Sequence, residues 1–185
     1  MFDNPFKFRK INHETKSLCS SEVLVQHNYC FRGKHSKRYI VQVEEYGYGV
    51  FVIKFFLADH RNHPDRYNKL SRLHECSRVI ATIGYIIKTI FRENPFCSFA
   101  FIGSPLPNEG EQNTKRFRLY SKVVGTLISI VEFEHYNSID NSAYLLLNRH
   151  NQEPGLLNKV IATFKRAYGN EHFNLLSGNE NDRVI

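Results

Sequence analysis

Two neighbouring segments in the first third of the chain, Tyr39–Glu45 and Val50–Leu57, have the clearest strand pattern. Both are rich in Val, Ile, Tyr and Phe, residues that favour strands, and they flank the sequence Tyr-Gly-Tyr-Gly at positions 46–49. Because glycine adopts positive φ without steric cost, this spacing predicts a β-hairpin. The second arm is apolar on both faces apart from Lys54, which predicts a central strand covered on both sides.

Farther along the chain, apolar residues recur every three or four positions and predict three helices. The first spans Asn68–Glu93 and ends before an Asn-Pro pair, because proline disfavours helical backbone at the preceding residue. The second begins at Asn113, whose side chain is expected to cap the helix. The third follows Pro154 and ends at Gly169, residue types that commonly begin and terminate helices.

The other apolar segments predict shorter strands, two of them forming a second hairpin. They are Phe6–Ile11, Glu22–Phe31, Cys97–Gly103, Glu132–Asn137 and Ser142–Asn148. The order strands, helix, strand, helix, hairpin, helix predicts an α+β fold, a mostly antiparallel twisted sheet with three helices packed on it. A single domain is expected over residues 1–169, with residues 170–185 as a polar, flexible tail.

The net charge of the chain indicates which kinds of partner it favours. The chain has 25 Lys and Arg against 18 Asp and Glu, a formal net charge of +7 at pH 7 and a pI of about 9.3. This excess favours an anionic ligand, an acidic protein face or nucleic acid as partner. The four cysteines are scattered, and no apolar run reaches the roughly 18 to 20 residues of a membrane span. We therefore expect a cytoplasmic protein with reduced thiols and no membrane contact.

One polar loop has the residue types of a metal site. The segment Asp59–Asp65 contains two histidines and two carboxylates, which are common ligands of zinc. No second cluster in the sequence has ligand spacing, so we predict a solvated polar loop and no metal site.

A cationic helix start follows the strand Cys97–Gly103. The first N–H groups of a helix have no intrahelical partner and can hold an anion. Cations there are disfavoured by the helix dipole by about 0.3 to 1 kcal/mol, so a cluster of them indicates an anionic partner. The predicted anion-binding residues are Asn113, Lys115, Arg116 and Arg118. The alternative is a solvated basic face that Glu109 and Glu111 neutralise.

Residues 113–125 carry a family resemblance. The segment Asn-Thr-Lys-Arg-Phe-Arg-Leu-Tyr-Ser-Lys-Val-Val-Gly resembles the helix N-x-x-A-x-x-L-Y-E-K-x-G-F in the last third of the GNAT acetyltransferase superfamily. The corresponding residues are Asn113, Leu119, Tyr120 and Lys122, with Gly125 one place late. The resemblance implies that the strand Val50–Leu57 and the helix Asn68–Glu93 hold acetyl-CoA, and that Tyr120 is the general acid toward the leaving thiolate.

Three functions stay open. The pyrophosphate loop of that family needs glycines, and residues 58–68 contain none, so the leading hypothesis is a non-catalytic binding module with a basic surface and no cofactor. The order of strands and helices predicted for this chain is similar to that of small cytosolic bacterial proteins with no assigned function. A GNAT-like acyltransferase using acetyl-CoA is the first alternative.

A nucleic-acid-binding protein is the second alternative, with a basic stripe along the first predicted helix and aromatic rings for base stacking. The stripe residues are Arg66, Lys69, Arg72, Arg78, Lys88 and Arg92 together with the cluster at 115–122, and the rings, expected to be exposed, are Tyr67 and Tyr85.

Overall fold

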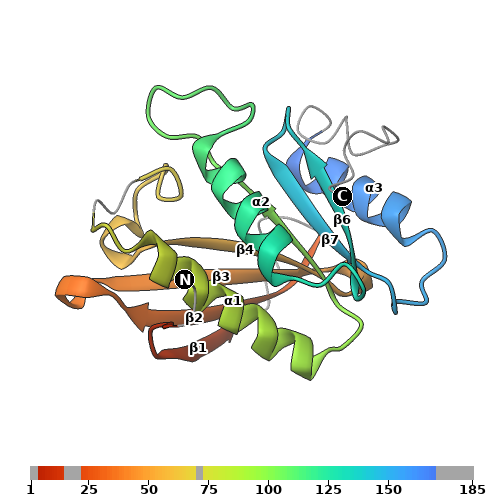
Figure 1. Ribbon diagram of the computed structural model, residues 1–185, viewed down its shortest axis with the longest axis horizontal. Helices are drawn as coiled ribbons and strands as arrows, with labels where there is room; N and C mark the ends of the chain where they lie inside the picture. Colours follow the sequence, from red (N-terminus) through yellow and green to blue (C-terminus); the bar gives the residue numbers. More distant parts are fainter. Residues whose placement is uncertain (1–3, 15–21, 70–72, 170–185) are drawn as a thin grey trace.

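The computed structural model describes residues 4–14, 22–69 and 73–169, without the side chains of residues 12–14 and 127. The predicted tail, residues 170–185, lies outside the described residues. The described part of the chain forms seven strands and three α-helices (Figure 1). The strands are β1 (Phe8–Glu14), β2 (Val23–Arg32), β3 (Arg38–Tyr46), β4 (Val50–Leu57), β5 (Ser98–Ile102), β6 (Phe133–Ser138) and β7 (Ala143–Asn148). The helices are α1 (Cys76–Glu93), α2 (Lys115–Leu127) and α3 (Leu156–Tyr168).

The seven strands form one sheet in the order β1-β2-β3-β4-β5-β7-β6. Neighbouring strands are antiparallel except β4 and β5, which run parallel and are connected through the crossover helix α1. The predicted α+β class, with three helices and a mostly antiparallel sheet, is confirmed. The central position of β4 is confirmed as well, because it is the fourth of the seven strands and is largely buried.

Both predicted hairpins are present. In the first, Tyr46 of β3 pairs with Val50 of β4 across a short turn. Positive φ occurs at Tyr48 and Gly49 of this turn, so only one of the two glycines is used in the predicted way. In the second hairpin, β6 and β7 pair from Phe133 opposite Asn148 to the turn after Ser138.

The two parallel strands separate soon after they meet. Pairing between β4 and β5 is limited to three residue pairs, the last of which is Val52 with Ala100. Beyond that point β4 continues to Leu57 beside β3, whereas the end of β5 pairs with β7. The sheet therefore has a gap at its centre that side chains must fill.

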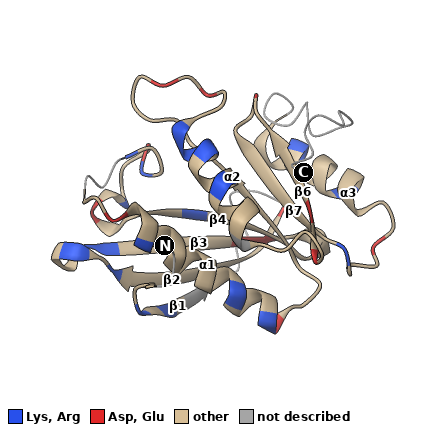
Figure 2. Ribbon diagram, in the orientation of Figure 1, with Lys and Arg blue, Asp and Glu red and all other residues tan. Residues whose placement is uncertain are grey.

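Helices cover both faces of the sheet (Figure 1). α1 and α2 pack on the face that carries Val41 and Phe99, where Ile86 of α1 is fully buried. α3 packs on the opposite face through Val160 and Phe164. Lys and Arg occur along both α1 and α2 (Figure 2). None of the helices in the described part of the chain has the length and apolarity that crossing a bilayer requires.

The first helix is shorter than predicted, because α1 begins at Cys76 and not at Asn68. His74 has a φ of 50°, which is incompatible with a right-handed helix. The guanidinium of Arg116 donates hydrogen bonds to the carbonyl oxygens of Asn68 and Lys69, at 3.2 and 3.0 Å. A tertiary contact therefore holds the segment before α1 in a non-helical path.

The cap of α2 lies one residue later than predicted. Asn113 has a φ of 49°, and Thr114 is the N-cap, with its Oγ1 accepting a hydrogen bond from the N–H of Phe117 at 3.1 Å. The Thr114 hydroxyl also donates to the carbonyl of Gly103 at 2.6 Å. This buried threonine thus joins the end of β5 to the start of α2.

Gly103 permits the close contact between β5 and α2, and we predict that Gly103→Ala destabilises the protein. A β-carbon at Gly103 would lie 2.6 Å from the Cα of Phe117, so the helix would have to move. We expect the free energy of unfolding to fall by about 1 to 3 kcal/mol, measured by urea denaturation. Gly110→Ala is the control, because a β-carbon there has no neighbour within 4 Å. Equal stability of the two variants would contradict the prediction.

Candidate functional site

The gap between β4 and β5 is the strongest candidate for a functional site, and Tyr120 of α2 occupies it from one face. Its ring lies between Phe55 of β4 and Phe101 of β5, with centroid distances of 6.0 and 5.6 Å. The position of Tyr120 on the buried side of α2 follows from the apolar spacing of that helix. Burial raises the pKa of Tyr120, so the phenol is protonated at neutral pH.

An aromatic row extends from Tyr120 toward the sheet edge. Phe101 stacks on Tyr144 of β7 at a centroid distance of 5.2 Å, and the Tyr144 hydroxyl lies 2.9 Å from Nδ1 of His135 on β6. Burial lowers the pKa of His135 and raises the pKa of Tyr144 to about 12. Both side chains are therefore neutral at pH 7, and the imidazole tautomer decides which of the two groups donates the hydrogen bond.

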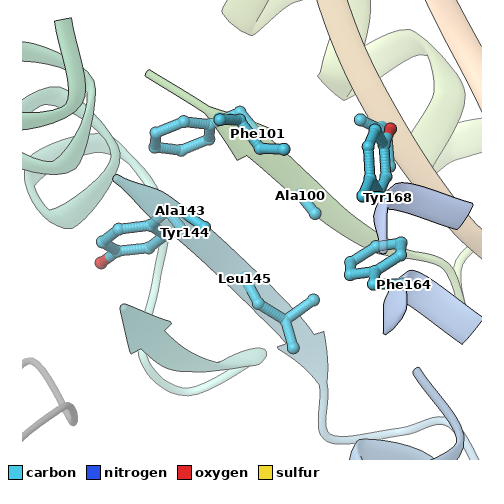
Figure 3. Close-up of a pocket in the computed structure, with 9 residues that line it drawn as sticks. Ala100, Phe101, Ala143, Tyr144, Leu145, Phe164 and Tyr168 are labelled. Atoms are coloured by element: carbon cyan, nitrogen blue, oxygen red, sulfur yellow. The ribbon is translucent and has the colours of Figure 1, made fainter. Parts of the chain in front are cut away.

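The opposite face of the gap is closed by α3. Phe164 and Tyr168 approach Ala100 of β5 and Leu145 of β7 (Figure 3). The cavity that remains is apolar and has a volume of about 10 Å³, room for no more than one water molecule. Between α3 and the strands β5 and β7, apolar side chains therefore leave no room for a cofactor.

A buried polar network lies beside this cavity on the same face. Nζ of Lys54 lies 2.7 Å from Oε2 of Glu44, whose carboxylate also accepts a hydrogen bond from the Tyr46 hydroxyl at 3.0 Å. The hydroxyl groups of Tyr46 and Tyr168 lie 2.9 Å apart. Burial alone would lower the pKa of Lys54, but Tyr168 and Glu44 together outweigh it and raise the pKa. The network brings three elements together: β3, β4 and α3.

Sequence reasoning missed this network. The one available signal was Lys54, a charge within an otherwise apolar strand. Its partner Glu44 lies diagonally across the hairpin, since Lys54 pairs with Gln42 and Glu44 with Val52. Tyr168 comes from the last helix, so no local pattern connects it to the hairpin.

The start of α1 carries a buried carboxylate. Glu75, the residue before α1, is 3% exposed. Its carboxylate accepts hydrogen bonds from the N–H of Lys34 at 2.6 Å and from the Tyr39 hydroxyl at 2.8 Å. A β-carbon at Gly33 would lie 2.5 Å from the same carboxylate, so a larger residue there would have to displace the Glu75 side chain. The helix start that the GNAT resemblance would assign to a pyrophosphate therefore has a negative charge beside it.

The start of α2 also has a carboxylate of this chain next to it. The N–H groups of Leu106 and Lys115 donate to Glu109 at 2.9 and 2.7 Å. These two backbone hydrogen bonds lower the pKa of Glu109. An external anion at this helix start would have to compete with the Glu109 carboxylate.

The four predicted anion-binding residues lie together in and before the first turn of α2. Arg116 points back to the loop before α1, where it donates to the carbonyls of Tyr67, Asn68 and Lys69. Arg118 donates to the carbonyl of Asn113. Both guanidinium groups thus bind carbonyls of the chain, whereas the Lys115 side chain is exposed.

Only part of the predicted basic stripe is exposed to solvent. Arg78 stacks on Phe6 at 3.9 Å and donates to the carbonyl of Asn4, so it closes one side of the core. Tyr67, predicted as exposed, is half-buried, whereas Tyr85 is exposed. Arg72 lies outside the described residues.

Comparison with protein-family models, with curated proteins and with solved structures finds no match. Among residues 4–14, 22–69 and 73–169, no group of three or more His, Cys, Asp or Glu is placed to hold a metal ion.

We predict that Lys54→Met lowers the free energy of unfolding at pH 7 by about 3 kcal/mol, because it leaves the Glu44 carboxylate buried without its cation. The control is the double variant Glu44→Gln with Lys54→Met, which removes the uncompensated charge. It should recover at least about half of the loss in urea denaturation. A double variant as unstable as the single one would show that the ion pair is not the cause.

The buried tyrosines predict a loss of stability in alkali. Burial raises the pKa of Tyr29 and Tyr144 to about 12 and also raises the pKa of Tyr46, Tyr120 and Tyr168. The unfolded phenol titrates near 10, so this stabilisation is complete below about pH 10 and lost as the pH rises through 12. Phenolate absorbance should therefore increase together with the loss of circular dichroism. A gradual increase with the fold intact would contradict this.

Proposed function

We propose that the protein is a non-catalytic binding module whose basic surface holds an anionic partner. The observation that carries the proposal is Tyr120, which fills the gap between β4 and β5 against Phe55 and Phe101. An acyltransferase related to the GNAT family would need this gap for its cofactor. Here α2 and α3 close it from both faces with apolar side chains of the chain itself.

The start of α1 supports the same proposal. A pyrophosphate binds where free N–H groups converge and no negative charge competes. Glu75 places a buried carboxylate immediately before α1, and the preceding loop, residues 58–69, contains no glycine that would let backbone approach a phosphate. Electrostatic repulsion from Glu75 would therefore weaken the binding of coenzyme A at this helix.

A GNAT-like acyltransferase using acetyl-CoA is the second candidate, and the parting of β4 and β5 favours it. Two parallel strands that diverge after three residue pairs leave a place where an extended ligand can insert. Tyr120 stands at that place with a raised pKa, so its phenol could donate a proton. In this candidate Tyr120 is the general acid, and its ring must move to admit the cofactor.

Acetyl-CoA distinguishes the two candidates. We predict that millimolar acetyl-CoA leaves the melting temperature unchanged, because Tyr120 occupies one face of the gap and side chains of α3 occupy the other. A ligand at 100 times its Kd would instead stabilise the native state by about 2.7 kcal/mol. The controls are coenzyme A without the acetyl group and a melting scan of buffer without protein.

Tyr120 variants complete this test. Tyr120→Phe keeps the ring and should keep stability within about 1 kcal/mol, whereas Tyr120→Ala should lose about 3 to 4 kcal/mol. Two results together would replace the binding-module proposal by the acyltransferase. The first is a rise in the melting temperature with acetyl-CoA that occurs in the wild type and persists in Tyr120→Phe. The second is acetyl transfer by the wild type that Tyr120→Phe loses.

A further inference from the structure

Three basic segments that are far apart in the sequence meet at one end of the molecule. They are the β2–β3 turn (residues 32–38), the loop after β4 (residues 58–69) and the first two turns of α2 (residues 115–122). Lys37 of the turn forms an ion pair with Asp59 of the loop at 2.5 Å. Arg116 of α2 binds the carbonyls of Asn68 and Lys69 in the same loop. We call this surface the basic end.

The basic end has more positive charge than the whole protein. Its three segments contain eleven Lys and Arg, two Asp and no Glu, a formal surplus of nine. The net charge of the chain is +7, so the remaining residues together have a net charge of −2. The exposed cations are Arg32, Lys34, Lys37, Arg38, Arg61, Lys69, Lys115, Arg118 and Lys122. Such a one-sided distribution is the electrostatic footprint of a polyanion-binding surface.

The β2–β3 turn holds its cations in a fixed arrangement. The N–H of Gly33 donates to the carbonyl of Lys37 at 2.8 Å, and the N–H of Lys37 donates to that of Lys34 at 3.1 Å. His35 and Ser36 have φ values of 53° and 57°, a left-handed conformation that costs free energy in residues other than glycine. The bond from Lys34 to buried Glu75 ties the turn to α1. A rigid turn loses little conformational entropy when its side chains bind.

The composition of the basic end favours a phosphate backbone over a folded protein. A protein interface has an apolar centre, whereas backbone contacts to nucleic acid need cations and hydrogen-bond donors. Among the large hydrophobic side chains that are exposed in the described part of the chain, Leu119 alone belongs to the three segments. Cations spread over three segments also exceed what one small anion can contact.

The basic end offers few aromatic side chains on which bases could stack. The exposed aromatic side chains in the described residues are Tyr48, Tyr85 and Phe96, and each lies outside the three segments. Tyr67 lies within them, but it is half-buried and its hydroxyl donates to Gln42 at 2.5 Å. Binding to a single strand depends on such stacking platforms, whereas a duplex presents its phosphates on the outside.

We propose that the basic end binds the phosphate backbone of a double-stranded nucleic acid without reading its sequence. The proposal rests on the proposed function, since it names the anionic partner of the binding module. DNA and RNA duplexes share the recognised phosphate chemistry, and the experiment separates them.

The experiment measures fluorescence anisotropy of labelled duplexes of roughly 20 base pairs, one DNA and one RNA, from about 50 to about 200 mM KCl. We expect the affinity of the full chain for at least one duplex to fall by at least about 100-fold over this range. The test variant combines Lys34→Gln, Arg38→Gln and Lys115→Gln, one or two cations from each of two segments. Its affinity should fall by at least about tenfold at low salt, and its salt slope should decrease by up to about 3.

The control removes the same charge from another part of the molecule. It combines Lys88→Gln and Arg92→Gln, in the second half of α1, with Lys165→Gln, in the last turn of α3. The control should bind within about twofold of the wild type, and circular dichroism should show all three proteins folded. Equal losses in the two triple variants would overturn the proposal, since net charge alone would then explain binding.

Two further outcomes would overturn the proposal. One is no binding to either duplex at low salt, and the other is tighter binding to a single strand or to polyglutamate than to a duplex. Neither outcome affects the acetyl-CoA measurement, which tests the binding module separately. A DNA preference or an RNA preference each supports the proposal and identifies the duplex.

Discussion

The structure depends on how the chain fills the space where β4 and β5 part. The crossover through α1 makes these strands parallel, and their pairing ends after Val52 and Ala100. A void at the centre of a sheet would be costly, because protein interiors are close-packed. Tyr120 fills the space from one face and Phe164 borders it on the other. The positions of α2 and α3 are therefore fixed by the same gap.

Carboxylates that bind groups of the chain itself have a second organising effect. Glu44 binds Lys54, and Glu75 accepts hydrogen bonds from the β2–β3 turn. Glu109 does the same for N–H groups at the start of α2. These acidic side chains bind partners within the chain. Many Lys and Arg side chains at the basic end therefore face solvent and have no acidic side chain of the same segment beside them. A modest net charge is thereby concentrated on one surface.

Local patterns were sufficient where the signal lies within one segment. The hairpin of β3 and β4 was predicted from its strand-favouring residues and its Tyr-Gly-Tyr-Gly turn, and α3 was predicted from apolar residues that repeat with a period of 3.6. The start of α1 was predicted wrongly, because Arg116, distant in sequence, holds the carbonyls that a longer helix would use. The cap of α2 was one residue off, since Asn113 and Thr114 both suit an N-cap and only the contact of Thr114 with Gly103 decides between them.

The sequence by itself determined the α+β class, the central place of β4 and the buried side of α2 on which Tyr120 lies, because each follows from the local arrangement of apolar residues. Only the tertiary structure decided which side chains meet. Tyr46 and Tyr168 are 122 residues apart yet share a hydrogen bond, and the three segments of the basic end come from opposite halves of the chain. Such contacts depend on strand order and helix placement, and these are set by packing the whole chain around one sheet.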